Sequence, residues 1–183
     1  MKIGILALQG AYSLHREKFK ELNINCIYIK TKDEIRKVDG LVFPGGESTT
    51  MIYLLKKHDL WNTLKEKVFK VPVLATCAGT ILLKELKYID MEIMRNAYGR
   101  QKESSMRYVK LDSSLKKKYF QAFFIRAPLI KKIHCRSTKI LSRLNNSPVL
   151  IRKKKVVAST FHPELGKGNT IHKYFLTFFN NES

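Results

Sequence analysis

The chain is predicted to fold as an α/β protein with three layers, in which helices flank a mostly parallel central sheet. Three observations carry this prediction. Short apolar runs alternate with amphipathic segments through the first half of the chain, short strand-like runs separated by turn residues fill residues 91 to 160, and an amphipathic helix is predicted at Ile171–Phe179. The middle stretch adds an antiparallel segment in the C-terminal half. At 183 residues, the whole chain 1–183 is expected to form a single domain.

The elements of the first half follow one another as strand, helix, strand. Each apolar run is short enough for a buried strand, and the segments between them have helical spacing of apolar residues. The predicted strands are Lys2–Leu8, Cys26–Ile29, Gly40–Phe43 and Val71–Ala75. The predicted helices are Ala11–Leu22, Glu47–Leu55, Trp61–Val68 and Thr80–Leu86. Alternation of this kind is typical of parallel strands joined by helical crossovers.

Cys77 lies at the junction between a buried strand and a helix. The small residues Ala78 and Gly79 follow it and allow a sharp turn, the geometry that exposes a nucleophile in α/β-hydrolases. The positive end of the helix dipole favours the thiolate, and backbone N–H groups at the turn could hold an oxyanion. Taken alone, a small buried cysteine packed under a helix explains this pattern equally well.

A second polar motif, His162-Pro163-Glu164, ends the predicted strand that begins at Val156. Residues two apart on a strand point to the same side, so Glu164 is expected beside the His162 ring. A carboxylate in that place selects the imidazole tautomer and stabilises the imidazolium cation. Together with Cys77, these residues predict a nucleophile, a general base and an orienting carboxylate.

Several polar or glycine positions come directly after predicted strands. These are Gln9, Gly45, Gly46, Cys77 and His162. Open parallel sheets bind ligands at the carboxyl ends of their strands, so these positions are expected to converge on one crevice. The two glycines by themselves indicate no more than a turn. They are not a phosphate loop, because the Gly-Lys-Ser/Thr ending is missing.

The net charge of +20 favours a different class of function, the nucleic-acid-binding proteins. The basic residues are nevertheless scattered, with short clusters at 116–118, 131–132 and 153–155, the last at the predicted tip of a hairpin. No platform of interleaved aromatic residues accompanies them. We therefore interpret the charge as a solvated, lysine-rich surface, part of which could face an acidic partner, and expect no nucleic-acid partner.

The three cysteines, Cys26, Cys77 and Cys135, are odd in number and lack metal-type spacing, which argues against disulfides and a metal site. Cys26 and Cys135 fall within predicted strands. The N-terminal apolar run is too short for a signal peptide, and no stretch approaches the length of a membrane span. A cytoplasmic protein without cofactor, metal or membrane partner is expected.

Six blocks of sequence together resemble the class I glutamine amidotransferases. The finer matches narrow the resemblance to the glutaminase subunits of pyridoxal 5'-phosphate synthase. The blocks run in that family's order over nearly the whole chain and are Ala7–Ala11 with His15, Pro44–Thr50, Thr76–Gly79, Arg95–Gln101, Phe124–Pro128 and Ser159–Leu165.

The resemblance implies the roles of the site residues. Cys77, His162 and Glu164 would form a triad that hydrolyses L-glutamine to L-glutamate and ammonia. The N–H groups of Gly46 and Ala78 would stabilise the oxyanion. Gln9 and Gly10 would couple the site to a separate synthase subunit, which receives the ammonia. The residues implied to bind glutamine are Gly46, Glu47, Ser48, Arg95, Ile125 and Arg126, and an arginine suits the substrate carboxylate because its fork binds both oxygens.

Two departures from the family pattern stand out. The segment between Cys77 and Arg95 is short, which leaves little room for a loop at the rim of the site, and Thr80 stands where an aliphatic residue is expected.

Two alternative functions remain open. One is a glutaminase domain that serves another synthase, such as an imidazole-glycerol-phosphate enzyme. The other is a non-catalytic basic binding protein on the same scaffold.

Overall fold

The computed structural model describes residues 1–97 and 105–179. Within them, one large sheet has the strand order β2-β1-β3-β4-β11-β10-β9-β6-β7, and β5 pairs with β8 in a small second sheet. The strands are β1 (Ile3–Leu6), β2 (Cys26–Ile29), β3 (Gly40–Phe43), β4 (Val73–Thr76), β5 (Met91–Met94), β6 (Ser105–Leu111), β7 (Tyr119–Phe124), β8 (Leu129–Ile133), β9 (Thr138–Leu144), β10 (Ser147–Lys153) and β11 (Val156–Ser159).

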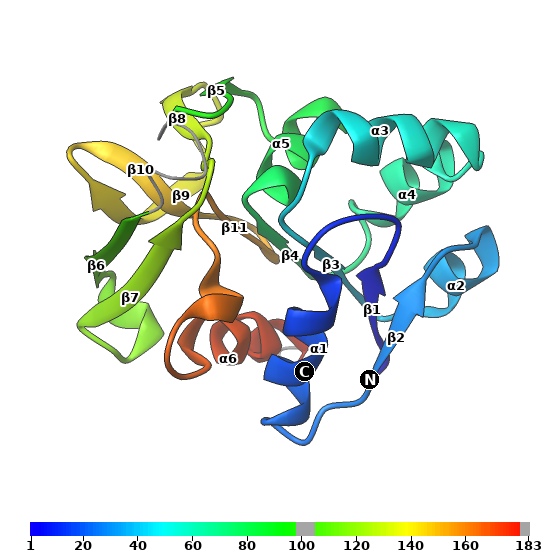
Figure 1. Ribbon diagram of the computed structural model, residues 1–183, viewed down its shortest axis with the longest axis horizontal. Helices are drawn as coiled ribbons and strands as arrows, with labels where there is room; N and C mark the ends of the chain where they lie inside the picture. The colour runs from blue at the N-terminus through cyan, green and yellow to red at the C-terminus, as the bar shows by residue number, and fades with distance from the viewer. Residues whose placement is uncertain (98–104, 180–183) are drawn as a thin grey trace.

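Helices cover both faces of the large sheet, which confirms the predicted three-layer α/β class (Figure 1). In Figure 1, α1 (Tyr12–Lys20) and α6 (Thr170–Leu176) lie below the sheet, whereas α3 (Ser48–Lys57), α4 (Trp61–Lys67) and α5 (Ala78–Glu85) lie above it. The closing helix is shorter than predicted and continues as the 3-10 helix η4 (Thr177–Phe179). Two further 3-10 turns are η2 (Ser113–Leu115) and η3 (Pro163–Leu165).

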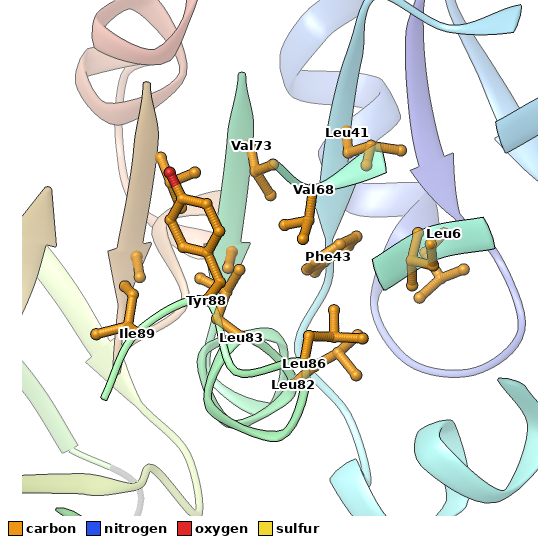
Figure 2. Close-up of a cluster of buried hydrophobic side chains, with 14 of the residues drawn as sticks. Leu6, Leu41, Phe43, Val68, Val73, Leu82, Leu83, Leu86, Tyr88 and Ile89 are labelled. Atoms are coloured by element: carbon orange, nitrogen blue, oxygen red, sulfur yellow. The ribbon is translucent and has the colours of Figure 1, made fainter. Parts of the chain in front are cut away.

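Each layer of helices buries its own apolar cluster against the sheet. Above the sheet, Leu82, Leu83 and Leu86 of the α5 region pack against Phe43 of β3 and Val73 of β4, as Figure 2 shows. Below it, aromatic side chains from α1, α6 and β7 pack in the second cluster against apolar residues of the sheet, such as Ile3, Val42 and Leu74. Because both faces of β1, β3, β4 and β11 are buried, these strands are continuous apolar runs in the sequence.

The change from parallel to antiparallel pairing occurs at β11. This strand pairs parallel with β4, Ser159 standing opposite Thr76, and antiparallel with β10. The sequence prediction, which assigned residues 91 to 160 to a largely antiparallel segment, is correct for β5 to β10 and incomplete for β11. The parallel pairing of β11 with β4 brings the segments after Thr76 and Ser159 side by side.

One helix was not predicted. The short α2 (Lys32–Lys37) begins at a capping box in which the Thr31 hydroxyl accepts from the Glu34 N–H and the Glu34 carboxylate accepts from the Thr31 N–H. A threonine followed three residues later by a glutamate is a signal for a helix start, and it was present in the sequence.

Two smaller expectations need correction. Cys135 lies between β8 and β9 and outside any strand. The β10–β11 hairpin forms as predicted, but its tip is only partly solvated, because the Lys153 ammonium donates to the Tyr88 carbonyl at 2.7 Å and lies over the Tyr88 ring. In the described part of the chain, no helix is long and apolar enough to cross a membrane.

Candidate active site

Cys77 stands at a strained elbow between β4 and α5, as the sequence predicts. Its backbone has φ of 48° and ψ of −107°, a conformation that residues other than glycine rarely adopt. The Cys77 N–H donates to the Ser159 carbonyl at 2.9 Å, which ties the elbow to the end of β11. A side chain at Gly79 would clash with the Phe43 carbonyl, so only glycine lets α5 approach β3 this closely.

His162 approaches from the end of β11. Its N–H donates to the Phe123 carbonyl of β7 at 2.9 Å, and its Nδ1 lies 2.7 Å from Oε1 of Glu164. The predicted proximity is therefore present, although the predicted reason is wrong. The strand ends at Ser159, and Glu164 returns to the ring because Pro163–Leu165 form a 3-10 turn. The fixed φ of Pro163 suits the first position of such a turn.

The protonation of His162 follows from its neighbours. Burial by itself lowers the pKa of an imidazole, but hydrogen bonds to Cys77 and Glu164 outweigh burial and raise the pKa of His162 to about 10. Burial likewise acts to raise the pKa of Glu164, yet interactions with His15 and His162 hold it below its ordinary value. The pair is therefore an imidazolium beside a carboxylate at neutral pH.

The β1–α1 and β3–α3 loops interlock beside Cys77. The Ala11 N–H donates to the Gly45 carbonyl at 3.0 Å, and the Gln9 side chain accepts from the Glu47 N–H at 2.9 Å. Gly10 has φ of +95°, and a Cβ there would clash with the Gly45 carbonyl oxygen. The contact therefore fixes the Gly45–Gly46 peptide and requires glycine at position 10.

These elements enclose a cavity of about 280 Å³, close to the lower end of the range for small-molecule sites. Ten of the predicted site residues line it, while Glu164 is buried behind His162 and Gly10 packs behind Gly45. The ten are Gln9, Gly46, Glu47, Ser48, Cys77, Ala78, Arg95, Ile125, Arg126 and His162.

The two arginines of the cavity are held by different partners. Arg126 has φ of 47°, and its guanidinium lies 2.9 Å from the Glu47 carboxylate. Arg95 donates to the Thr49 hydroxyl at 2.9 Å and lies 3.6 Å from Glu85. Both ion pairs are half-exposed, so they add little to stability and leave the guanidinium groups available to a ligand.

Sequence reasoning missed four residues of the cavity wall and one group behind it. Thr49, Ile81, Asn96 and Pro128 line the cavity. Thr49, Asn96 and Pro128 belong to sequence blocks already singled out, which was a usable signal for them. His15 was noted only as part of a motif, and its side chain lies 3.4 Å from Glu164. Residues 98–101 of the Arg95–Gln101 block lie outside the described residues.

The unexpected Thr80 is accounted for locally, because its hydroxyl donates to the Ser159 carbonyl at 2.6 Å.

Over residues 1–97 and 105–179, no group of three or more His, Cys, Asp or Glu side chains is arranged to hold a metal ion. Cys77, His162 and Glu164 supply a thiol, an imidazole and a carboxylate to this site.

Comparison with known proteins gives a consistent result. The profile of the SNO glutamine amidotransferase family matches residues 5–181. The pyridoxal 5'-phosphate synthase subunit PdxT of Francisella tularensis subsp. tularensis (strain WY96-3418) is 42% identical over 96% of this chain and 97% of its own length. PdxT of Francisella tularensis subsp. novicida (strain U112) is 41% identical over the same shares.

Solved structures agree at the level of the fold. A crystal structure of a glutamine amidotransferase superposes with a TM-score of 0.89 at 34% identity and covers 97% of this chain and 98% of that chain. The structure of PurLQS from Thermotoga maritima superposes with a TM-score of 0.70 at 12% identity and covers 100% of this chain and 99% of that chain. At 12% identity, the similarity to PurLQS shows a shared fold and nothing about function.

Proposed function

Because the chain belongs to the SNO glutamine amidotransferase family, we propose that it hydrolyses L-glutamine with Cys77, His162 and Glu164 and delivers the ammonia to a separate synthase subunit. The protein is the glutaminase subunit of a pyridoxal 5'-phosphate synthase. The observation that carries the mechanistic proposal is that Cys77 and His162 line one cavity while Nδ1 of His162 lies 2.7 Å from Oε1 of the buried Glu164. We further propose that residues 1–183 act as one glutaminase domain.

In this mechanism the Cys77 thiolate attacks the carboxamide carbon of glutamine. The N–H groups of Ala78 and Gly46 stabilise the oxyanion of the tetrahedral intermediate. The His162 imidazolium donates its proton to the departing ammonia, and a γ-glutamyl thioester remains on Cys77. Neutral His162 then takes a proton from water, which attacks the thioester and releases glutamate, while Glu164 stabilises the imidazolium.

The residues proposed to bind the substrate present complementary charges. The guanidinium groups of Arg95 and Arg126 offer forks for the α-carboxylate, and Glu47 offsets the α-ammonium group. Ser48 offers a hydroxyl, and Ile125 lies over the thiol, with the Cys77 Sγ 3.9 Å from the Ile125 carbonyl oxygen. In the free protein Glu47 pairs with Arg126, so glutamine binding would replace one ion pair by two.

The synthase subunit is proposed to switch the site on through the β1–α1 loop. Gln9 and Gly10 contact the Gly45–Gly46 turn directly, so a partner that moves this loop also moves the peptide whose N–H must face the oxyanion. A displacement of ~1 Å at such a group changes the rate by about a hundredfold. The reactive thiol also fits a reducing compartment, and we propose the cytoplasm.

The test is to mix the purified protein with its cognate synthase subunit and to measure glutamine-dependent formation of pyridoxal 5'-phosphate. With the wild-type protein, we expect glutamine to support formation of pyridoxal 5'-phosphate. With Cys77→Ala in its place, we expect ammonium to support this reaction and glutamine not to support it. Glutamate release should rise at least several-fold on addition of the synthase, and Gln9→Ala should blunt this rise. Glutamine-supported product with Cys77→Ala would refute the proposal.

The alternative of a glutaminase that serves another synthase shares every step up to ammonia release, and the 42% identity to a PdxT subunit argues against it. Measuring pyridoxal 5'-phosphate rather than glutamate alone distinguishes the two. The third candidate, a non-catalytic basic binding protein, is inconsistent with membership of an amidotransferase family and with homology to a synthase subunit.

A further inference from the structure

Two buried histidines extend the polar chain behind Glu164. His15 of α1 and His172 of α6 are both fully buried, and Nδ1 of His15 lies 3.0 Å from Nε2 of His172. On its other side, Nε2 of His15 lies 3.1 Å from the Thr76 hydroxyl and 3.4 Å from Oε2 of Glu164. A continuous line of ring nitrogens and carboxylate oxygens thus runs from α6 to His162.

The carboxylate selects one tautomer of His15. If the proton were on Nδ1, the lone pair of Nε2 would face the negative Oε2 of Glu164, which is repulsive. With the proton on Nε2, the N–H points toward Thr76 and Glu164. Nδ1 then accepts, and its partner at 3.0 Å, the Nε2 of His172, must be the donor.

The state of His172 agrees with this assignment. With its proton on Nε2, its Nδ1 is a bare acceptor, and Nδ1 is the atom of this ring that has no hydrogen-bond partner within the described residues. Burial lowers the pKa of His15, with Glu164 acting to raise it and His162 to lower it. Burial also lowers the pKa of His172, aided by His15 and Lys18. Both rings are therefore neutral at physiological pH, as a chain of single donors requires.

Glu164 is a buried carboxylate with one oxygen that lacks a hydrogen-bond donor among the residues that the structure describes. The carboxylate is only 4% exposed, and its Oε1 faces His162. Its Oε2 makes no hydrogen bond within residues 1–97 and 105–179, and the Nε2 of His15 is an ionisable nitrogen lying across from it. A buried carboxylate oxygen without compensation is costly and favours protonation or rotation of the group.

We propose that His15 is a positioning residue of the glutaminase reaction, whose neutral Nε2–H holds Glu164 ionised and turned toward His162, with His172 fixing the His15 tautomer. This inference rests on the proposed function for its kinetic consequence only. The titratable groups that face Glu164 are His162 from the β11 side and His15 from α1, with His172 and Lys18 one step further out.

The first experiment reads the tautomers directly and needs no activity. Long-range ¹H–¹⁵N NMR spectra of the ¹⁵N-histidine-labelled full chain distinguish Nε2–H, Nδ1–H and imidazolium rings. His15 and His172 are expected as neutral Nε2–H tautomers and His162 as imidazolium at pH 7. An Nδ1–H or imidazolium form of His15 would overturn the proposal, whether or not the protein proves to be a glutaminase.

The second experiment compares His15→Leu, which removes the donor, with His15→Gln, whose amide N–H reaches to about the same place. Both are assayed for glutamate release with the synthase subunit present, over a range of pH. For His15→Leu we expect kcat to fall about ten- to hundredfold with KM unchanged, the magnitude typical of losing an orienting partner. The acid limb of the pH–rate profile of His15→Leu should move to higher pH, because the pKa of Glu164 rises when the donor is lost. His15→Gln should recover most of both effects.

Phe19→Leu provides the matched control for packing. Phe19 is fully buried and stacks edge-on against His172 at 5.1 Å between ring centroids, and it offers Glu164 no donor. This variant should lose stability without moving the acid limb. An unmoved acid limb in a folded His15→Leu, or an equal shift in Phe19→Leu, would show that His15 acts through packing alone and would refute the proposal.

Discussion

Replacing Glu164 by Gln tests the electrostatics of the site. The substitution keeps the shape of the side chain but removes the negative charge that, together with Cys77, holds the proton on His162. The pKa of His162, about 10 in the native protein against an ordinary 6.5, is then expected to fall, because the hydrogen bond and the charge of Glu164 are lost while burial continues to lower it and only Cys77 continues to raise it. At pH 8 the native imidazolium fraction of about 99% would fall with it.

This loss of the general acid translates into rate. The lower protonation and the misorientation of the ring together predict a decrease of about 10²- to 10⁴-fold in kcat at pH 8, the range for a positioned general acid. The assay is glutamate release in the presence of the synthase subunit between pH 6 and 11. The pH–rate profile of the wild type should show an alkaline limb near pH 10, which moves to lower pH in Glu164→Gln. An alkaline limb at the same pH in both proteins would refute the assignment.

Stability gives an independent view of the same pair. The folded pKa of His162 lies above its ordinary value, so the stabilisation that it contributes is complete below about pH 6.5 and is lost as the pH rises through about 10. The melting temperatures of wild type and Glu164→Gln should therefore differ at neutral pH and converge in alkaline solution. Glu92→Gln is the matched control, because Glu92 pairs with His134 at 3.0 Å on the exposed surface and should have little effect.

Further substitutions and a binding assay test other parts of the account. Cys77→Ala should abolish glutamate release while leaving the melting temperature and synthase binding nearly unchanged, whereas Cys26→Ser and Cys135→Ser should keep most of the activity. Arg126→Ala should raise KM for glutamine about ten- to hundredfold with a smaller effect on kcat, because a charged hydrogen bond to the substrate is worth about 1.5–3 kcal/mol; an unchanged KM would remove Arg126 from the binding site. Duplex DNA should bind weakly and be released by moderate salt despite the net charge of +20, and tight, salt-resistant binding would contradict a solvated lysine surface.

The sequence predicted the large sheet and the convergence of the site well, because local signals agreed with the tertiary structure. Strands β2 and β3 have the predicted bounds, since both are short apolar runs flanked by polar or turn residues. Gln9, Gly46, Cys77 and His162 meet because each follows one of four adjacent strands, β1, β3, β4 and β11. The carboxyl ends of parallel strands lie at one edge of a sheet.

Features that depend on long-range contacts were not accessible in the same way. Tertiary packing sets the parallel pairing of β11 with β4, which the sequence did not predict. The 3-10 turn at Pro163–Leu165 replaces the extended backbone that was assumed between His162 and Glu164. The contact between Glu164 and His15 joins residues far apart in the chain. No local pattern distinguishes His15 from an ordinary buried histidine of an amphipathic helix.

Cys77 is proposed to be the nucleophile of a glutamine site, and this role can be tested directly. A diazoketone analogue of glutamine alkylates the nucleophile of such a site and can be located by peptide mass spectrometry. With the synthase subunit present, we expect one adduct, on the peptide that contains Cys77. It should form in step with the loss of glutamate release and be prevented by excess L-glutamine. Loss of activity with the adduct on Cys26 or Cys135, or glutamate release that persists after Cys77 is fully alkylated, would contradict it.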